Sequence, residues 1–216
     1  MQHTKQMAIT AILFALTATG YPDSGEKVIH KDKDIQVVLD KAEIQLKLLK
    51  SVSYTYHIEL LYKEEHYHNQ LSILSYINFD GHNNIPACRF QMKGNSFFSC
   101  FNGADYFSLN ETDKTIDIHK QPDSALFERQ TALNSSFVTL RNFLPVLKQN
   151  GSIKKSISDT GINQQEYYAV NFELYDQYLG YLGELKKFAD EYTGNQTKPY
   201  VLMISKRTFL PFKFIT

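Results

Sequence analysis

The stretch that decides the fold is CRFQMKGNSFFSCFNGADYFSLNETDKTIDIHK, residues 88–120. Turn-forming residues at 94–95, 102–103 and 111–114 divide it into four short apolar strands. Strands that are joined by such short turns pair with their neighbours in antiparallel order. The sequence therefore predicts a four-stranded antiparallel meander.

Turns of three, two and four residues at these places fix a register for the meander. Phe90 is then opposite Phe98, Phe98 is beside Phe107, and Phe107 is beside Ile118. One sheet face collects the apolar side chains Cys88, Phe90, Met92, Phe98, Cys100, Phe107, Leu109, Ile116 and Ile118. A one-residue slip would scatter this set, which favours the register. The face is either a sealed core or the lining of a cavity.

The same register places Cys88 directly across from Cys100. Cross-strand Cβ atoms lie about 4.5–5.5 Å apart, which is close to the spacing of a disulfide. The alternative is a pair of buried free thiols that pack as small apolar groups. The chain contains no CxxC, so these residues hold no thioredoxin-type redox site.

N-terminal to the meander, Asp34 precedes an apolar pattern of helical period. One face of this helix carries Ile35, Val38, Leu39, Ala42, Leu46 and Leu49. A second, narrower stripe holds Val37, Ile44 and Leu48. Two stripes fit a helix that lies inside a curved sheet, or ordinary packing with some exposed apolar residues.

Other elements follow from the same periodicities. A long half-buried strand is predicted at 52–63, with a returning strand at 71–79. The segment 122–150 is expected to be helical, with Pro145 shortening or kinking it. The last predicted elements are a strand at 166–174, an amphipathic helix at 177–190 and a hairpin of strands 200–205 and 208–215.

The first residues predict export. Lys5 precedes an apolar run from Met7 to Ala18, and the ending Ala18-x-Gly20 fits a signal peptide of residues 1–20. A buried first helix is the alternative, and the run is too short to span a membrane. We expect a flexible leader at 21–33, a domain at 34–216 and a periplasmic or otherwise exported location. Because an apolar strand precedes Thr216 without a closing turn, we also expect this chain to be truncated at its C-terminus.

Composition and motifs argue against several functions. Lysine and arginine number 23 against 23 acidic residues, so no basic field for nucleic acid is present. The motifs GxSxG, GxGxxG and HExxH are missing, as is a Walker loop. A cluster resembling metal ligands, Glu64, Glu65, His66 and His68, is polar and fits a solvated turn better than a site. The sequence therefore favours a protein without catalysis, metal or cofactor.

Binding is the favoured activity. Antiparallel strands and many Phe and Tyr side chains suit an apolar cavity, although they suit an ordinary core as well. The candidate cavity residues are Tyr54, Tyr56, Ile58, Phe90, Phe98, Phe107, Leu109 and Ile118, with Phe137 and Leu140 as lid contacts. The expected partner is a hydrophobic ligand or an exported protein.

Three segments resemble a known superfamily. They are VVLDKAEIQLKLLKSVSYTYHIEL (37–60), FFSCFNGADYFSLN with TIDIHK (97–110 and 115–120), and YVLMISKRTFLPFKF (200–214). The last contains I-x-K-x-T-x-x-P-x-K, formed by Ile204, Lys206, Thr208, Pro211 and Lys213. This order is similar to the LolA/LolB-like periplasmic carriers of outer-membrane lipoproteins. It more closely resembles the carrier-like domain that precedes a thioredoxin domain in exported thiol–disulfide oxidoreductases of Bacteroidetes-type bacteria.

The resemblance implies an α+β fold, in which an open, curved antiparallel sheet, a half-barrel, wraps over two or three helices. Its concave side would hold an acyl chain of a lipid or lipoprotein, or another hydrophobic partner. The alternative that it implies is an N-terminal accessory domain of an oxidoreductase, whose thioredoxin module is missing from these residues.

Overall fold

The computed structural model describes residues 8–13, 32–62, 67–79, 86–130, 133, 136–188 and 196–215. It is an α+β structure dominated by antiparallel sheet. The strands are β1 (Ala8–Leu13), β2 (Ser51–Tyr62), β3 (Tyr67–Asn78), β4 (Arg89–Lys93), β5 (Phe97–Phe101), β6 (Asp105–Asn110), β7 (Thr115–Lys120), β8 (Lys155–Ile162), β9 (Gln165–Tyr175), β10 (Gln177–Leu179), β11 (Leu185–Lys187), β12 (Thr197–Ser205) and β13 (Pro211–Ile215). The helices are α1 (Asp32–Leu48), α2 (Ser124–Phe127) and α3 (Phe137–Gln149).

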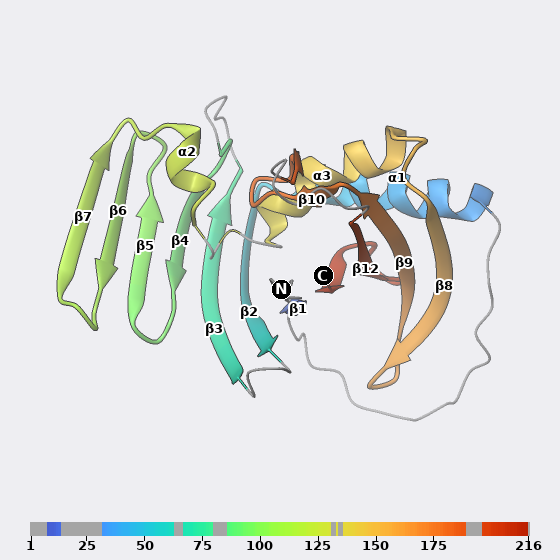
Figure 1. Ribbon diagram of the computed structural model, residues 1–216, viewed down its shortest axis with the longest axis horizontal. Helices are drawn as coiled ribbons and strands as arrows, with labels where there is room; N and C mark the ends of the chain where they lie inside the picture. The colour runs from blue at the N-terminus through green and yellow to red at the C-terminus, as the bar shows by residue number, and fades with distance from the viewer. Residues whose placement is uncertain are drawn as a thin grey trace, which may run out of the picture.

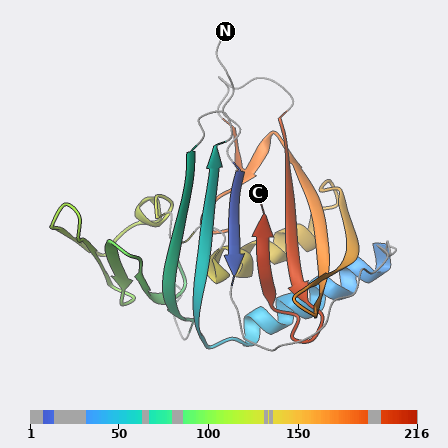
Figure 2. The same cartoon turned by 90° about the horizontal axis from the view of Figure 1, so that it is seen from below.

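One open sheet organises the molecule, with the strand order β7-β6-β5-β4-β3-β2-β1-β13-β12-β9-β8. Helices α1 and α3 lie together over the strands that follow β3 in this order, and α2 lies over the opposite end (Figure 1). Seen from below, the long strands curve past the helices (Figure 2). We call β4–β7 with α2 the wing, and the sheet face that the helices cover the inner face.

Aromatic side chains fill the inner face beneath the helices. Phe172 of β9 stacks on Tyr200 of β12, with ring centroids 5.1 Å apart and planes inclined by 5°. Phe143 of α3 contacts Phe172, and Phe137 of α3 meets Tyr54 of β2 at 4.8 Å. Burial of rings of this size is a major source of stability. The helices are therefore fixed to the sheet by aromatic contacts.

The burial of side chains on helix α1 distinguishes between the two interpretations of its apolar stripes. Its main stripe is buried: Ile35, Val38, Leu39, Ala42 and Leu46. The second stripe is exposed, at 49% for Val37, 55% for Ile44 and 68% for Leu48. The helix thus packs on one side only. The guanidinium of Arg141 from α3 donates to the carbonyls of Leu46 and Leu49, each at 3.0 Å, and so caps the C-terminal end.

Strand β1 falls within the predicted signal peptide. Its backbone pairs with β2 on one side and β13 on the other, and Ala11 lies opposite both Ile58 and Phe214. The signal peptide stays a prediction. Its removal would take β1 with it and leave facing edges of β2 and β13 unpaired.

The register of the meander is confirmed in one hairpin and wrong in the others. Phe107 pairs with Ile118 as predicted. Phe98, however, pairs with Leu109, two residues from the expected partner, and Phe90 pairs with Phe101. Because the shift between β4 and β5 is an odd number of residues, it moves the predicted apolar set of β5–β7 to the outer face.

The turns explain this difference. The Gly94 N–H donates to the Phe97 carbonyl at 3.0 Å, which makes 95–96 a two-residue turn in place of a three-residue loop. In the next hairpin the turn is formed by residues 103–104, one position later than the predicted 102–103. Gly103 is therefore the first residue of this turn, and its φ is 101°. This left-handed conformation suits glycine.

The predicted helix at 177–190 is wrong. Its described residues form the hairpin β10–β11, in which Leu179 pairs with Leu185. Gly183 has a φ of 92°, which is incompatible with a helix. A Cβ at this position would collide with the carbonyl of Thr139 in α3. The apolar spacing thus serves a hairpin that packs closely on α3.

Candidate functional site

The ten predicted cavity residues do not line one cavity. Five of them belong to a single hydrophobic core, and a sixth, Tyr54, is partly buried against it; the five are Tyr56, Ile58, Phe90, Phe137 and Leu140. Burial raises the pKa of both Tyr54 and Tyr56 well above the ordinary value. These inner-face residues pack against one another and against the helices.

The other four predicted residues, Phe98, Phe107, Leu109 and Ile118, lie on the outer face. They belong to two parallel rows that cross β3 to β7, given by the pairings of the sheet. The apolar members of these rows are Leu74, Tyr76, Phe98, Cys100, Phe107, Leu109, Ile116 and Ile118, which we call the outer strip. Exposed fractions of 55% for Leu74, 59% for Ile116 and 65% for Ile118 show that it faces solvent at both ends. Gln91 and Lys93 of β4 interrupt both rows, so the contiguous apolar part of the strip covers β5–β7. Exposed apolar surface of this kind marks interaction sites.

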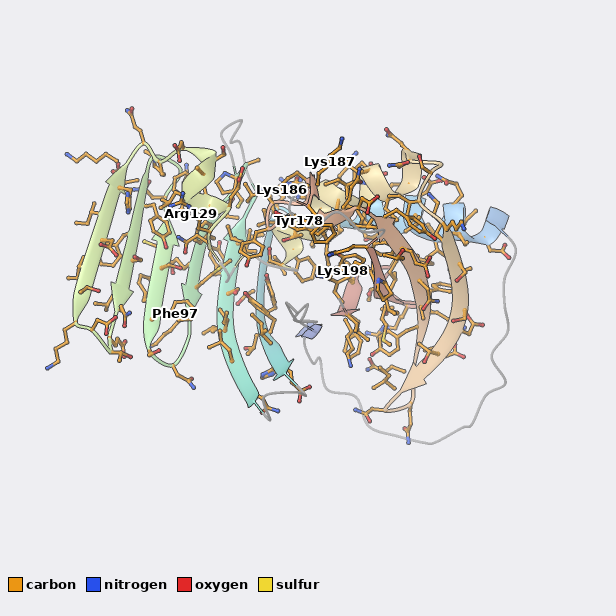
Figure 3. All side chains as sticks on the ribbon, in the orientation of Figure 1. Phe97, Arg129, Tyr178, Lys186, Lys187 and Lys198 are labelled. Carbon is orange, nitrogen blue, oxygen red and sulfur yellow. The ribbon has the colours of Figure 1, made fainter. Side chains whose placement is uncertain are left out.

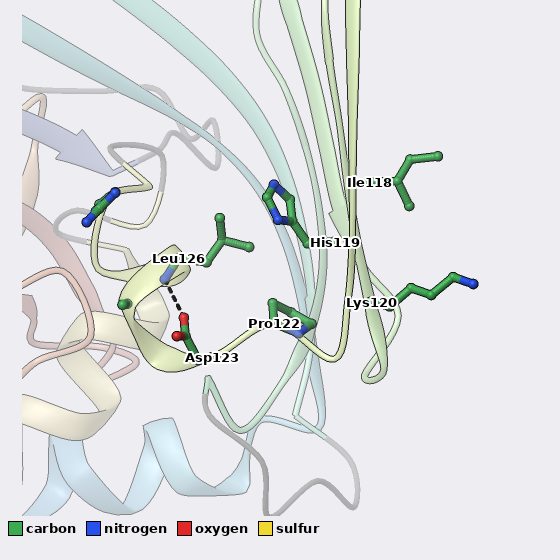
Figure 4. Close-up of a pocket in the computed structure, with 8 residues that line it drawn as sticks. Ile118, His119, Lys120, Pro122, Asp123 and Leu126 are labelled. Atoms are coloured by element: carbon green, nitrogen blue, oxygen red, sulfur yellow. Dashed lines mark hydrogen bonds between the residues drawn. The ribbon is translucent and has the colours of Figure 1, made fainter.

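A groove of about 560 Å³ lies between β7 and α2. It is lined by Ile118, His119, Lys120, Pro122, Asp123, Ala125, Leu126 and Arg129. Figure 4 shows His119 and Leu126 facing each other across it, whereas Ile118 and Lys120 point to the other side of the strand. The volume lies within the range of small-molecule sites.

Residues at the two ends of α2 hold this helix beside the sheet. Asp123 caps the N-terminus, because its Oδ1 accepts the N–H of Leu126 at 3.1 Å. Phe127 is fully buried and its ring meets those of Phe101 at 4.9 Å and Tyr106 at 6.0 Å. This anchor holds the short helix, so that its remaining side chains form one wall of the groove.

Polar ties reinforce the same wall. The hydroxyl of Tyr106 donates to Oε1 of Gln130 at 2.9 Å, and burial raises the pKa of this tyrosine, which keeps the hydroxyl a donor. Nζ of Lys186 in β11 lies 2.6 Å from Oε2 of Glu128 and 3.1 Å from Oε1 of Glu184. The hydrogen bond with Glu128 raises the pKa of Lys186. The α2 end of the wing is thus tied to the β10–β11 hairpin.

Basic side chains lie in the groove and close to it. Arg129 lines the groove together with one carboxylate, Asp123, which caps the helix, whereas the side chain of Lys120 points to the other side of β7 (Figure 4). In Figure 3 Arg129 lies on the wing, and Lys186 and Lys187 lie together beyond it. The groove therefore combines aliphatic side chains with the guanidinium of Arg129, which suits an apolar molecule that carries an anionic group.

Both cysteines are free. Cys88 is buried on the inner side, whereas Cys100 pairs with Gln91 on the outer face. The predicted disulfide is therefore not formed, because the corrected register separates the two residues by the thickness of the sheet. Burial raises the pKa of Cys88 to about 12 and also raises that of Cys100.

The groove offers binding groups and no assembled reaction centre: His119 contacts the ring of Tyr106, and Asp123 is bound to backbone. Within the described residues, no group of three or more His, Cys, Asp or Glu side chains could hold a metal ion. The side chains of the predicted metal-like cluster lie outside that part. None of the described helices has both the length and the apolar character needed to cross a membrane.

Sequence reasoning found only Ile118 among the groove residues. The available signal was Asp123 followed by Ser-Ala-Leu, an N-cap pattern that predicts a helix start directly after a strand. The sequence matches no protein-family model, and no curated protein is significantly similar to it.

Proposed function

We propose that this chain is an exported carrier-like domain that binds an apolar ligand, such as the acyl chain of a lipid or lipoprotein, without catalysis. The ligand lies in the groove between β7 and α2. The observation that carries this proposal is the pairing of the aliphatic side chains of Ala125 and Leu126 with the guanidinium of Arg129 in one groove. The LolA/LolB-like resemblance supports the class of ligand and the exported location.

The packing of the inner face supports the choice of the groove. Phe90, Tyr106 and Phe127 are at most 2% exposed, so an acyl chain has no room among them without displacing α2. In the groove, the aliphatic side chains of Ala125 and Leu126 remain accessible near the cationic Arg129. An apolar tail would contact Leu126 and Ala125, and an anionic head group would meet Arg129.

A fluorescent long-chain fatty acid and its methyl ester test the proposal by titration of the purified protein. Ala125→Phe fills the groove from the exposed side of α2 and should raise the Kd of both probes at least about tenfold, or ~1.4 kcal/mol. Arg129→Glu should weaken the acid and leave the ester unchanged.

Each groove variant has a matched control. Ala104→Phe places the same ring on an exposed turn, and Arg207→Glu makes the same charge change in the β12–β13 turn. Equal binding by Ala125→Phe and Ala104→Phe would contradict the proposed location. Equal loss of acid and ester in Arg129→Glu would contradict the role of the charge.

A second candidate is the accessory domain of a thiol–disulfide oxidoreductase, which the outer strip favours. A partner module would cover the apolar side chains of β3 and β5–β7. Isothermal titration calorimetry with a purified thioredoxin-type domain from such an oxidoreductase measures the affinity of this interaction. Leu109→Lys should abolish binding, whereas Thr55→Lys, an exposed position of the same row, should not. Binding that ignores Leu109→Lys would reject the strip as the interface.

A further inference from the structure

Strand β7 is a free edge of the sheet. It ends the strand order, and each of its six residues is exposed. In Figure 1 α2 lies above the wing, and none of the described helices lies beside the outer margin of β7. At the opposite end of the order, α1 packs near β8. An uncovered edge strand is a ready template for another strand.

The free backbone groups of this edge can be assigned. The N–H of Gln121 donates to the carbonyl of Ala104 at 2.9 Å, just beyond the β6–β7 ladder. Because hydrogen-bonded positions alternate along an antiparallel pair, Asp117 and His119 direct their backbone groups toward β6. The N–H and C=O groups of Ile116, Ile118 and Lys120 therefore lie at the open margin.

The central side chains of β7 do not protect it, and its one lysine, Lys120, stands at the end of the strand. Edge strands are commonly blunted by lysine, proline or a bulge. Here the two central free positions are isoleucines, 59% and 65% exposed, on the outer face. The charged or titratable groups at the centre, Asp117 and His119, point to the inner face, as the pairing of His119 with Tyr106 shows.

We infer that a second copy of this chain pairs with β7 along this edge, antiparallel to it and centred on Ile118. In this register Ile118 is opposite its own copy, Ile116 is opposite Lys120, and Asp117 is opposite the partner's His119. The three facing pairs exchange about six backbone hydrogen bonds. The interface is isologous and closed, which is the commonest form of protein dimer.

Charge favours this register over the one centred on Asp117, and it favours a second copy as the occupant. Centring on Asp117 would set two aspartates directly opposite each other, which destabilises a sheet pair. Centring on Ile118 gives two Asp–His pairs at non-hydrogen-bonded positions, where the side chains approach most closely. The sequence of β7 is thus complementary to itself. Since one strand pair buries little area, we expect a weak, concentration-dependent dimer.

Sedimentation velocity of the full chain, from about 10 µM to about 1 mM, measures the dimer over the range of weak interfaces. The wild type should sediment increasingly as a dimer. Asp117→Lys places lysine opposite the partner's His119 and should raise the dimer Kd at least about tenfold. Asp117→Lys combined with His119→Asp restores opposite charges and should recover the dimer. Glu166→Lys, the same charge change at a side chain 77% exposed in β9, should have no effect.

Ile118→Lys should abolish the dimer, with circular dichroism confirming that each variant is folded. A monomeric wild type throughout the range would overturn the inference. So would a dimer that survives Ile118→Lys, or a failure of the double variant to recover it. The fatty-acid titrations measure ligand binding and not dimerisation. A monomeric protein would therefore contradict this inference without contradicting the groove proposal.

Discussion

Phe90 of β4 is directly opposite Phe101 of β5, and the centroids of their rings lie 6.1 Å apart on the inner face. This pair fixes which residues of the wing are core and which face solvent. It places Phe98 and Cys100 on the outer strip, away from Cys88. The contact therefore separates an inner groove from an outer apolar surface.

The first prediction concerns the thiols. Unfolding the protein without reductant should give two alkylated cysteines by mass spectrometry. In the native protein at pH 8, Cys100 should react before Cys88, since burial holds the pKa of Cys88 at about 12 and the thiolate is the reactive form. A mass two hydrogens lower, with no alkylation after unfolding, would show a disulfide and contradict the register.

The second prediction concerns the anchor of α2. Phe127→Ala removes a fully buried ring between Phe101 and Tyr106, and should lower the free energy of unfolding by about 3–5 kcal/mol. Ile118→Ala, at an exposed position of β7, should change it by no more than about 0.5 kcal/mol. Urea denaturation measures both, and equal losses would mean that α2 is not held by this ring.

The third prediction concerns the cap of α1. Arg141→Met keeps the length of the side chain and removes the donors to Leu46 and Leu49. We expect a loss of about 1–3 kcal/mol in the free energy of unfolding, because two part-buried carbonyls lose a charged partner. Arg207→Met in an exposed turn is the control. Unchanged stability of the Arg141 variant would show that the cap contributes nothing.

The fourth prediction concerns acid stability. Hydrogen bonds from Lys148 and Lys47 lower the pKa of Glu43, which links α1 to α3. A lowered pKa contributes stability above the ordinary value of 4.5, and this contribution is lost as the pH falls through the folded-state pKa. Glu43→Gln should therefore be less stable than wild type at pH 7, with the difference shrinking toward about pH 3. Unfolding curves at pH 7, 5 and 3 check this, with Glu166→Gln as control; a constant difference would contradict it.

Part of the fold follows from local sequence. The 111–114 turn fixes the β6–β7 register, and alternation defines β2, because both signals lie within a few residues of the strands concerned. The β4–β5 register depends instead on which of several turn-forming residues occupies the centre of the turn. That choice is made by packing of Phe90 on Phe101 and Phe127, which are distant in sequence.

The groove could not be predicted from residue types. By residue type, Lys120, Asp123 and Arg129 are ordinary surface residues. They lie near one another only because Phe127 fixes α2 against the sheet. The segment 177–190 shows the same limit, because the fit of Gly183 against Thr139 overrides a helical spacing of apolar residues.

Native mass spectrometry of the protein as purified under mild conditions, without added lipid, tests the central claim most directly. The groove proposal predicts a bound lipid as an added mass on wild type and on Ala104→Phe, and its loss from Ala125→Phe. Ligand-free wild type, or the same lipid retained by Ala125→Phe, would contradict it.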